Sequence, residues 1–211
     1  MKRGIIFDMD GTLWDSAEGV AQSWNEVLNT WNVDRSPLTA EDIHGVMGKT
    51  MTDIADILFS MVEQEERKKL LDACCSRELE YLAEHGGILY PQVKQTLQLL
   101  AKDYPLYIVS NCQSGYIEAF LSCYELEVYF KDIECFGNNG RQKGENIALL
   151  AERNRLEDAV YVGDIRDDYE ASMEAGVKFI HAAYGFGTIA ENIPRVQSFS
   201  ELPEIVATVF P

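Results

Sequence analysis

The segment that most constrains the fold is an apolar run near the start of the chain that ends in acidic residues. Residues 5–7 are Ile-Ile-Phe, and Asp8, Asp10, Gly11 and Thr12 follow within five positions. Such a run indicates a strand buried on both faces, as in a parallel sheet. Ligands of open α/β sheets bind at the carboxyl ends of the strands. We therefore expect Asp8 and Asp10 to face one site, with Gly11 permitting a sharp turn after the strand.

The charges of this segment need a partner. Two carboxylates two residues apart repel each other unless a cation or a shared proton relieves them. A divalent metal ion is the simplest relief for Asp8 and Asp10. The same residues also fit an ordinary acidic surface turn, because Asp and Gly are common in turns. The segment alone leaves both interpretations open.

An alternation of strands and helices over most of the chain predicts the fold class. Apolar runs predict buried strands at residues 106–110, 159–163 and 177–180, with a weaker short strand at 132–135. Helices are expected at residues 92–102, 114–123, 145–154, 168–175 and 202–210. This alternation implies right-handed crossovers between parallel strands. We therefore predict an α/β fold whose core is a doubly wound, Rossmann-like parallel sheet.

A helical region interrupts this alternation directly after the first strand. Apolar residues recur at helical spacing from Ala17 to Trp31, and Thr39 followed by Asp42 resembles a helix start. Two more helices are expected at residues 52–61 and 63–84. The prediction is an all-helical cap domain inserted into the core, with linkers near 13–18 and 84–91 and a candidate hinge at 86–87. The predicted boundaries are residues 16–86 for the cap, and residues 1–15 and 87–211 for the core.

Composition and charge limit the partners that such a chain can have. Its 211 residues are 46% hydrophobic and 25% charged, as in globular proteins. The net charge of −17 argues against a nucleic-acid backbone or an anionic membrane as partner. No apolar run reaches the roughly 18 residues that span a bilayer, and Asp8 interrupts the first apolar stretch, unlike in a signal peptide. We expect a cytoplasmic protein with five reduced cysteines, and a monomer as the default state.

Polar residues also stand at the ends of other predicted strands. Ser110 and Asn111 follow one strand, the acidic cluster 164–168 follows another, and Lys143 is a lone cation at a predicted helix start. Each has an ordinary explanation when taken alone, namely a helix cap, acidic residues at a helix N-terminus and a solvated lysine. Together with the first acidic segment, these residues predict one site at the edge of the sheet.

This series of motifs resembles the haloacid dehalogenase superfamily, whose members transfer phosphoryl groups through an aspartate nucleophile. The first motif is DMDGT at residues 8–12, and the fourth is a GDxxxD pattern that contains Asp164 and Asp168. The helical insertion and residues 184–187 are similar to the phosphoglycolate phosphatase and β-phosphoglucomutase group. The resemblance implies a Mg²⁺-dependent phosphatase, a phosphoric monoester hydrolase acting on a small phosphorylated metabolite through an aspartyl-phosphate intermediate.

The resemblance also implies which residues carry out phosphoryl transfer. Asp8 would attack phosphorus as the nucleophile. Asp10 would protonate the leaving oxygen and then deprotonate the attacking water. Ser110 and Asn111 would donate hydrogen bonds to the phosphoryl group. Thr12 would do the same or brace the loop.

Charge at the site would be balanced by one lysine and by Mg²⁺. Lys143 would neutralise charge on the nucleophile and on the phosphoryl oxygens. The resemblance places Mg²⁺ on Asp8, on the backbone carbonyl of Asp10 and on Asp164, with water molecules completing the octahedron. Asp168 would hold one of these water molecules or orient Lys143.

Two residues of this chain depart from the usual motifs of the group. Gly144 stands where many relatives have Pro, and Ile165 where Ser or Thr is frequent, but neither position has to supply a catalytic side chain. In the cap, we expect Lys49 to bind a second anionic group of the substrate, the alternative being a solvated helix-end lysine. The tryptophans at positions 14, 24 and 31 are expected to pack between cap and core.

Two other functions remain open at this point. A sugar phosphomutase of the superfamily would keep all these residues, but such mutases carry His where this chain has Val20, which favours hydrolysis. A non-catalytic, phosphate-responsive binding protein could share the fold. Such a protein has no chemical need for the intact set of Asp8, Asp10, Lys143 and Asp164.

Overall fold

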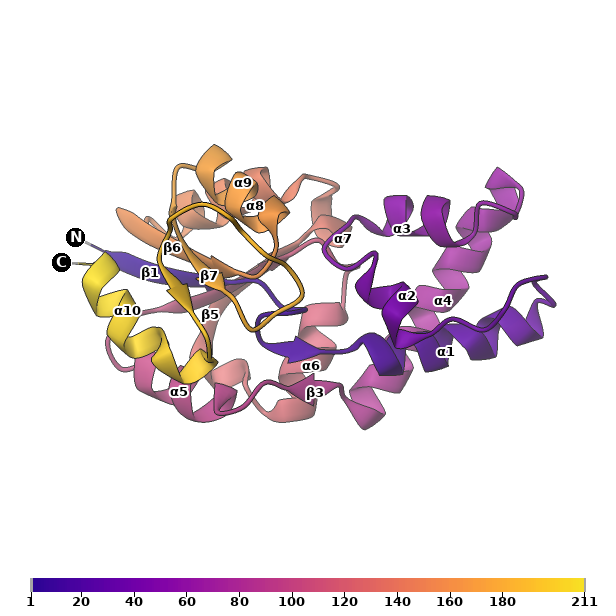
Figure 1. The fold of residues 1–211 in the computed structure, drawn as a ribbon, viewed down its shortest axis with the longest axis horizontal. Helices are drawn as coiled ribbons and strands as arrows, with labels where there is room; N and C mark the ends of the chain where they lie inside the picture. Colours follow the sequence, from indigo (N-terminus) through magenta and orange to yellow (C-terminus); the bar gives the residue numbers. More distant parts are fainter. Residues whose placement is uncertain (1, 211) are drawn as a thin grey trace.

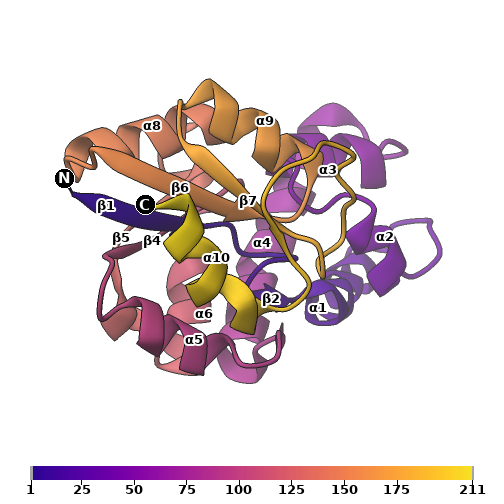
Figure 2. The ribbon, with the colours of Figure 1, turned by 60° about the vertical axis from the view of Figure 1, so that its left-hand side comes forward.

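The computed structural model describes residues 2–210 and consists of two units (Figure 1). One is a sheet with helices on both faces, which we call the core. The other, which we call the cap, holds helices α1 to α4 at one end of the molecule. Both ends of the described chain lie side by side at the opposite end of the core (Figures 1 and 2). Among the described residues, no helix is long and apolar enough to cross a membrane.

The core is built on a parallel sheet with strand order β5-β4-β1-β6-β7-β8. The strands are β1 (Arg3–Phe7), β4 (Leu106–Ser110), β5 (Phe130–Cys135), β6 (Asp158–Gly163), β7 (Lys178–Ala182) and β8 (Arg195–Val196). The predicted doubly wound, Rossmann-like parallel sheet is therefore confirmed. The two-residue strand β8 was not predicted, because so short a segment shows no periodic pattern.

Helices cover both faces of this sheet (Figure 2). One face carries α8 (Lys143–Arg153) and α9 (Arg166–Glu174); the other carries α5 (Val93–Leu100), α6 (Tyr116–Tyr124) and α10 (Leu202–Val209). Successive side chains of a strand point to opposite faces. Ile5 and Phe7 accordingly pack in one apolar cluster, and Ile6 packs in the other. Burial on both faces explains the uninterrupted apolar runs of the strands.

The cap consists of four helices, with α1 packed against α4. They are α1 (Ala17–Thr30), α2 (Ala40–His44), α3 (Met51–Leu58) and α4 (Gln64–His85). The predicted start of α2 is confirmed, because the Thr39 N–H donates to Asp42 Oδ2 (2.8 Å) and the Asp42 N–H donates to Thr39 Oγ1 (3.2 Å). Trp14 and Trp24 are buried, but the prediction for Trp31 is wrong: it is 40% exposed at the end of α1.

The two segments that join cap and core pair with each other. The strands β2 (Trp14–Asp15) and β3 (Ile88–Leu89) form a small antiparallel sheet. Beside it, the Tyr124 hydroxyl accepts from the Gly87 N–H (3.0 Å) and donates to the Gly87 carbonyl (2.6 Å). The sequence predicted only linkers here, because two-residue strands give no alternation to detect. The predicted cap boundaries, residues 16 and 86, lie next to this paired linker.

Candidate active site

The first strand delivers Asp8 to the carboxyl edge of the sheet. The Asp8 N–H still donates to the Val162 carbonyl of the neighbouring strand (2.9 Å), so the backbone of Asp8 is held by the sheet. The chain then turns at Gly11, whose φ is +86°. A Cβ atom at Gly11 would lie 2.2 Å from Asp164 Oδ2. Only glycine therefore fits this turn, for reasons of both backbone conformation and space.

Lys143, the first residue of α8, forms two buried ion pairs. Its Nζ atom lies 2.9 Å from Asp8 Oδ1 and 2.6 Å from Asp168 Oδ1. Burial lowers the pKa of Lys143, but the charges of Asp168 and Asp8 outweigh this effect and hold the pKa above its ordinary value. The lysine is thus a fixed positive charge beside the predicted nucleophile. Of the two roles predicted for Asp168, the structure shows the contact that orients Lys143.

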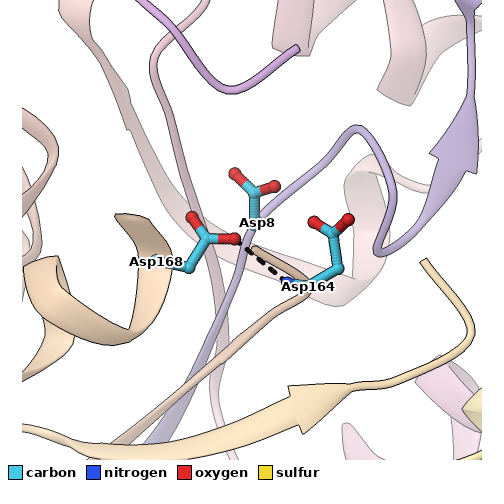
Figure 3. Close-up of side chains that lie close together, drawn as sticks. All are labelled: Asp8, Asp164 and Asp168. Atoms are coloured by element: carbon cyan, nitrogen blue, oxygen red, sulfur yellow. Dashed lines mark hydrogen bonds between the residues drawn. The ribbon is translucent and has the colours of Figure 1, made fainter. Parts of the chain in front are cut away.

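Three carboxylates converge beside this lysine (Figure 3). Carboxylate oxygens of Asp8, Asp164 and Asp168 all lie within 4.8 Å of one another. Burial, followed by the charge of Asp168, raises the pKa of Asp8 to about 7, although Lys143 lowers it. Burial also raises the pKa of Asp164 well above its ordinary value, with Asp168 adding to the effect. One ammonium group therefore leaves the ionised cluster with two unbalanced negative charges.

The hydrogen bonds of the cluster show which of these carboxylates is available to a metal ion. Asp168 Oδ2 accepts from the Asp164 N–H (3.0 Å; Figure 3) and the Ile165 N–H (3.2 Å). Asp164 Oδ2 accepts from the Phe186 N–H (2.7 Å), whereas its Oδ1 is buried without a hydrogen-bond partner in the described chain. A buried, unpaired carboxylate oxygen is costly unless a cation meets it. Asp8 and Asp164 thus fit a hard divalent cation that prefers oxygen ligands.

Asp10 lies outside this cluster and has its own partners. The Ser16 and Tyr116 hydroxyls reach the same Asp10 oxygen, Oδ1, at 2.7 Å and 2.9 Å. Burial raises the pKa of Asp10 to about 6, while the two hydrogen bonds lower it. The predicted contact of the Asp10 backbone carbonyl with the metal ion stays a prediction.

Sequence reasoning missed the two partners of Asp10, and also Tyr161. Ser16 stands in the N-cap position of α1, a place where a serine signals only a helix start. Its side chain makes no capping bond, because its hydroxyl bonds Asp10 instead. Nothing in the sequence marks Tyr116 or Tyr161. The Tyr161 hydroxyl donates to the Val109 carbonyl (2.8 Å) and lies 3.3 Å from Asp8 Oδ1.

The residues predicted to bind the phosphoryl group are placed at the strand ends. Ser110 is buried and lines the same pocket as Asp8. Asn111 Nδ2 donates to the Gly48 carbonyl of the cap (2.8 Å), and its Oδ1 is buried without a partner among residues 2–210. The Thr12 hydroxyl is likewise buried and unpaired within the described chain, so it does not brace the loop by a hydrogen bond. Their contacts with a phosphoryl group stay predictions.

A pocket of about 520 Å³, its open mouth included, lies between the core and the cap. Asp8, Asp10 and Ser110 line it on the core side. Most of its cap side is apolar, formed by Val20, Trp24, Ile43, Val46, Met47, Met51 and Ile54. Two charged cap residues, Lys49 and Glu78, complete the wall. The half-buried Lys49 has no ion pair within the described residues, and its contact with a second anionic group stays a prediction.

The cap loop touches the core at Gly48. Its φ is +81°, and a Cβ atom there would lie 2.4 Å from Ile165 Cδ1. Ile165, one of the two unusual residues of the motifs, thus packs against this glycine. The other, Gly144, lies where α8 meets α9: a Cβ atom would be 3.2 Å from the Ala171 carbonyl oxygen. Both departures from the usual pattern therefore lie at close packing contacts.

The chain is similar in sequence and in fold to known proteins. A family model for haloacid dehalogenase-like hydrolases matches residues 5–182, which include all four motif segments. A phosphoglycolate phosphatase from Salmonella typhimurium is 28% identical over 234 residues, covering 95% of this chain and 90% of that protein. Two crystal structures share the fold. One is described as a predicted phosphoglycolate phosphatase from Haemophilus somnus (TM-score 0.81, 22% identity, 97% of this chain and 98% of that one). The other is CbbY from Rhodobacter sphaeroides in complex with phosphate (TM-score 0.79, 20% identity, 96% of each chain).

Proposed function

Because this chain belongs to the haloacid dehalogenase-like hydrolase family, we propose that it is a Mg²⁺-dependent phosphatase of small phosphomonoesters. The observation that carries the proposal is the meeting of Asp8, Lys143 and Asp164 at the carboxyl edge of the sheet. These residues combine a nucleophile, a fixed positive charge and a free carboxylate oxygen. Such a set suits the transfer of a negatively charged phosphoryl group.

The first step is attack on phosphorus by Asp8. Lys143 bonds Asp8 Oδ1, which leaves Oδ2 to form the new bond to phosphorus. The bond between phosphorus and the leaving oxygen breaks, and Asp10 gives that oxygen a proton. A pKa of about 6 keeps part of Asp10 protonated near neutral pH, as a general acid requires. The product of this step is an aspartyl-phosphate on Asp8.

The second step hydrolyses this intermediate. Asp10, now ionised, takes a proton from a water molecule that attacks phosphorus, and the bond to Asp8 breaks. Ser110 and Asn111 donate hydrogen bonds to the phosphoryl oxygens. Asp8 and Asp164 would hold Mg²⁺, which would supply the two positive charges that the cluster lacks and would polarise the phosphoryl group.

The pocket between core and cap favours a small metabolite as substrate. The name of the Salmonella relative makes phosphoglycolate one candidate. We further propose that the protein acts in the cytoplasm as a monomer. Its net charge of −17 argues against nucleic-acid and anionic membrane partners. Val20, where phosphomutases carry His, is buried in the pocket wall and offers no base, which supports hydrolysis over phosphoryl shuttling.

Phosphate release from a panel of small phosphomonoesters tests the proposal. It is measured with Mg²⁺ or with EDTA, for the wild type, for Asp8→Asn and for the exposed control Asp103→Asn. We expect turnover that needs Mg²⁺, disappears in Asp8→Asn and is unchanged in Asp103→Asn. Turnover that survives in Asp8→Asn would refute the assigned nucleophile. A wild type inactive on the whole panel would favour the non-catalytic binding protein.

A further inference from the structure

Glu78, a residue of α4, is a buried acid in the pocket wall that the proposed mechanism does not use. Its side chain is 3% exposed and lines the pocket that also contains Asp8 and Asp10. The Trp24 indole N–H donates to Glu78 Oε2 (2.5 Å), and Gln113 Nε2 donates to Oε1 (3.1 Å). The carboxyl group is therefore fixed in position from both the cap and the core.

The surroundings of this acid leave it without a counter-charge. Burial raises the pKa of Glu78 to about 7; the bonds from Gln113 and Trp24 lower it, and the charge of Asp10 raises it. None of the ion pairs found among residues 2–210 includes Glu78. A buried acid without a cation costs stability that an apolar residue at this site would not. A function at the pocket would explain why an acid stands there.

Glu78 still has room for a ligand. A carboxylate offers about four acceptor positions, and each Glu78 oxygen receives one hydrogen bond from the protein. In the proposed reaction the leaving group lies between the cap wall and Asp10, which protonates it. Asp10 and Glu78 both line this pocket, so the two acids border the same space. Glu78 therefore lies where it can contact the leaving part of the substrate.

Resting on the phosphatase function above, we propose that Glu78 determines specificity by accepting a hydrogen bond from a hydroxyl or ammonium group of the leaving part. It selects phosphate esters of polyols or amino alcohols and disfavours esters with a carboxylate near the scissile bond. Lys49 lines both this pocket and an adjoining outer hollow, where it can bind a more distant anionic group.

A matched set of substrates tests this role. Propyl phosphate has no donor beside the ester, glycerol 1-phosphate has hydroxyls, phosphoethanolamine has an ammonium group, and phosphoglycolate has a carboxylate. We expect kcat/KM of the wild type to favour at least one donor ester over propyl phosphate by about tenfold or more. A higher kcat/KM for glycerol 1-phosphate identifies a hydroxyl as the preferred donor, and a higher value for phosphoethanolamine identifies an ammonium group.

Variants separate specificity from a structural role. Glu78→Gln keeps the size of the side chain but removes its charge, and Glu80→Gln changes an exposed residue two positions along α4. We expect Glu78→Gln to reduce the ratio of kcat/KM for the donor ester to that for propyl phosphate about tenfold. The ratio of kcat/KM for phosphoglycolate to that for propyl phosphate should rise. Glu80→Gln should leave all ratios unchanged. A thermal unfolding scan of each variant checks that it is folded.

This test distinguishes failure of the specificity role of Glu78 from failure of the phosphatase function. The specificity role is overturned if kcat/KM of the wild type is as high for propyl phosphate as for the donor esters. It is also overturned if Glu78→Gln changes kcat/KM for all four substrates by the same factor. In either case Glu78 serves only to join the cap to Gln113. If no ester is hydrolysed, the phosphatase function fails. In that case, binding of the same four compounds is measured by calorimetry, to Asp8→Asn and to the double variant with Glu78→Gln. The ratios of their binding constants to that of propyl phosphate then decide the role of Glu78.

Discussion

The buried acid Glu78 makes the stability of the protein depend on pH in a way that one substitution can isolate. The folded protein holds the Glu78 proton more tightly than the unfolded chain, since burial raises the pKa from 4.5 to about 7. The acid therefore imposes no penalty below pH 4.5. Its ionisation costs stability progressively as the pH rises from 4.5 to 7, and the full cost applies above that range. Glu78→Gln removes this titration while keeping the shape of the side chain.

The size of the effect follows from the shift in pKa. A rise in the pKa from 4.5 to about 7, at about 1.36 kcal/mol for each pH unit, gives a total of about 3 kcal/mol. Most of this total, roughly 2–3 kcal/mol, is expected between pH 5 and pH 8, because part of the titration lies outside that interval. The free energy of unfolding of Glu78→Gln minus that of the wild type should therefore rise by this amount from pH 5 to pH 8.

Urea unfolding followed by circular dichroism at pH 5 and pH 8, with EDTA present throughout, measures this difference. Changes in the hydrogen bonds to Trp24 and Gln113 add a constant that cancels between the two pH values. Glu80→Gln alters an exposed acid of the same helix. Its free energy of unfolding minus that of the wild type should be the same at pH 5 and pH 8. A difference between Glu78→Gln and wild type that is the same at both pH values would refute the reasoning, because it would mean that burial does not shift this titration.

Three further changes test the closed cap and the balance of charge. Gly48→Ala forces a side chain onto a backbone with φ +81°, so we expect the free energy of unfolding to fall by about 1–2 kcal/mol and KM to rise; urea unfolding and steady-state kinetics measure both. Lys143→Met leaves Asp8 and Asp168 without their counter-charge, and kcat should fall about 100-fold or more, with a loss of about 3 kcal/mol in unfolding experiments without metal. Mg²⁺ should raise the Tm of the wild type but not that of Asp164→Asn, and an equal rise in both would contradict the assigned metal ligand.

Much of the fold and of the core site could be predicted from the sequence, because both are encoded locally. The strand before Asp8 is a continuous apolar run, and parallel strands bring their carboxyl ends together whatever the details of packing. The contact of Tyr116 with Asp10 joins residues 106 positions apart, and no local pattern predicts it. Glu78 lies among charged residues of α4, so its burial becomes visible only when the core closes one face of that helix. For Trp31 the sequence predicted burial where the structure shows exposure. Its helical spacing suggested a buried position, but α1 has already ended there.

The pairing of β2 with β3 has a mechanical consequence for the cap. Two independent linkers would let the cap twist, slide and tilt, whereas two linkers joined by hydrogen bonds behave as one flat ribbon. A ribbon bends easily across its plane and resists shear within it. Tyr124, bonded twice to Gly87, fixes this ribbon where it enters the core. We expect any tilt of the cap to follow chiefly one axis, along which the Gly48 carbonyl stays aligned with the side-chain amide of Asn111 that it contacts here.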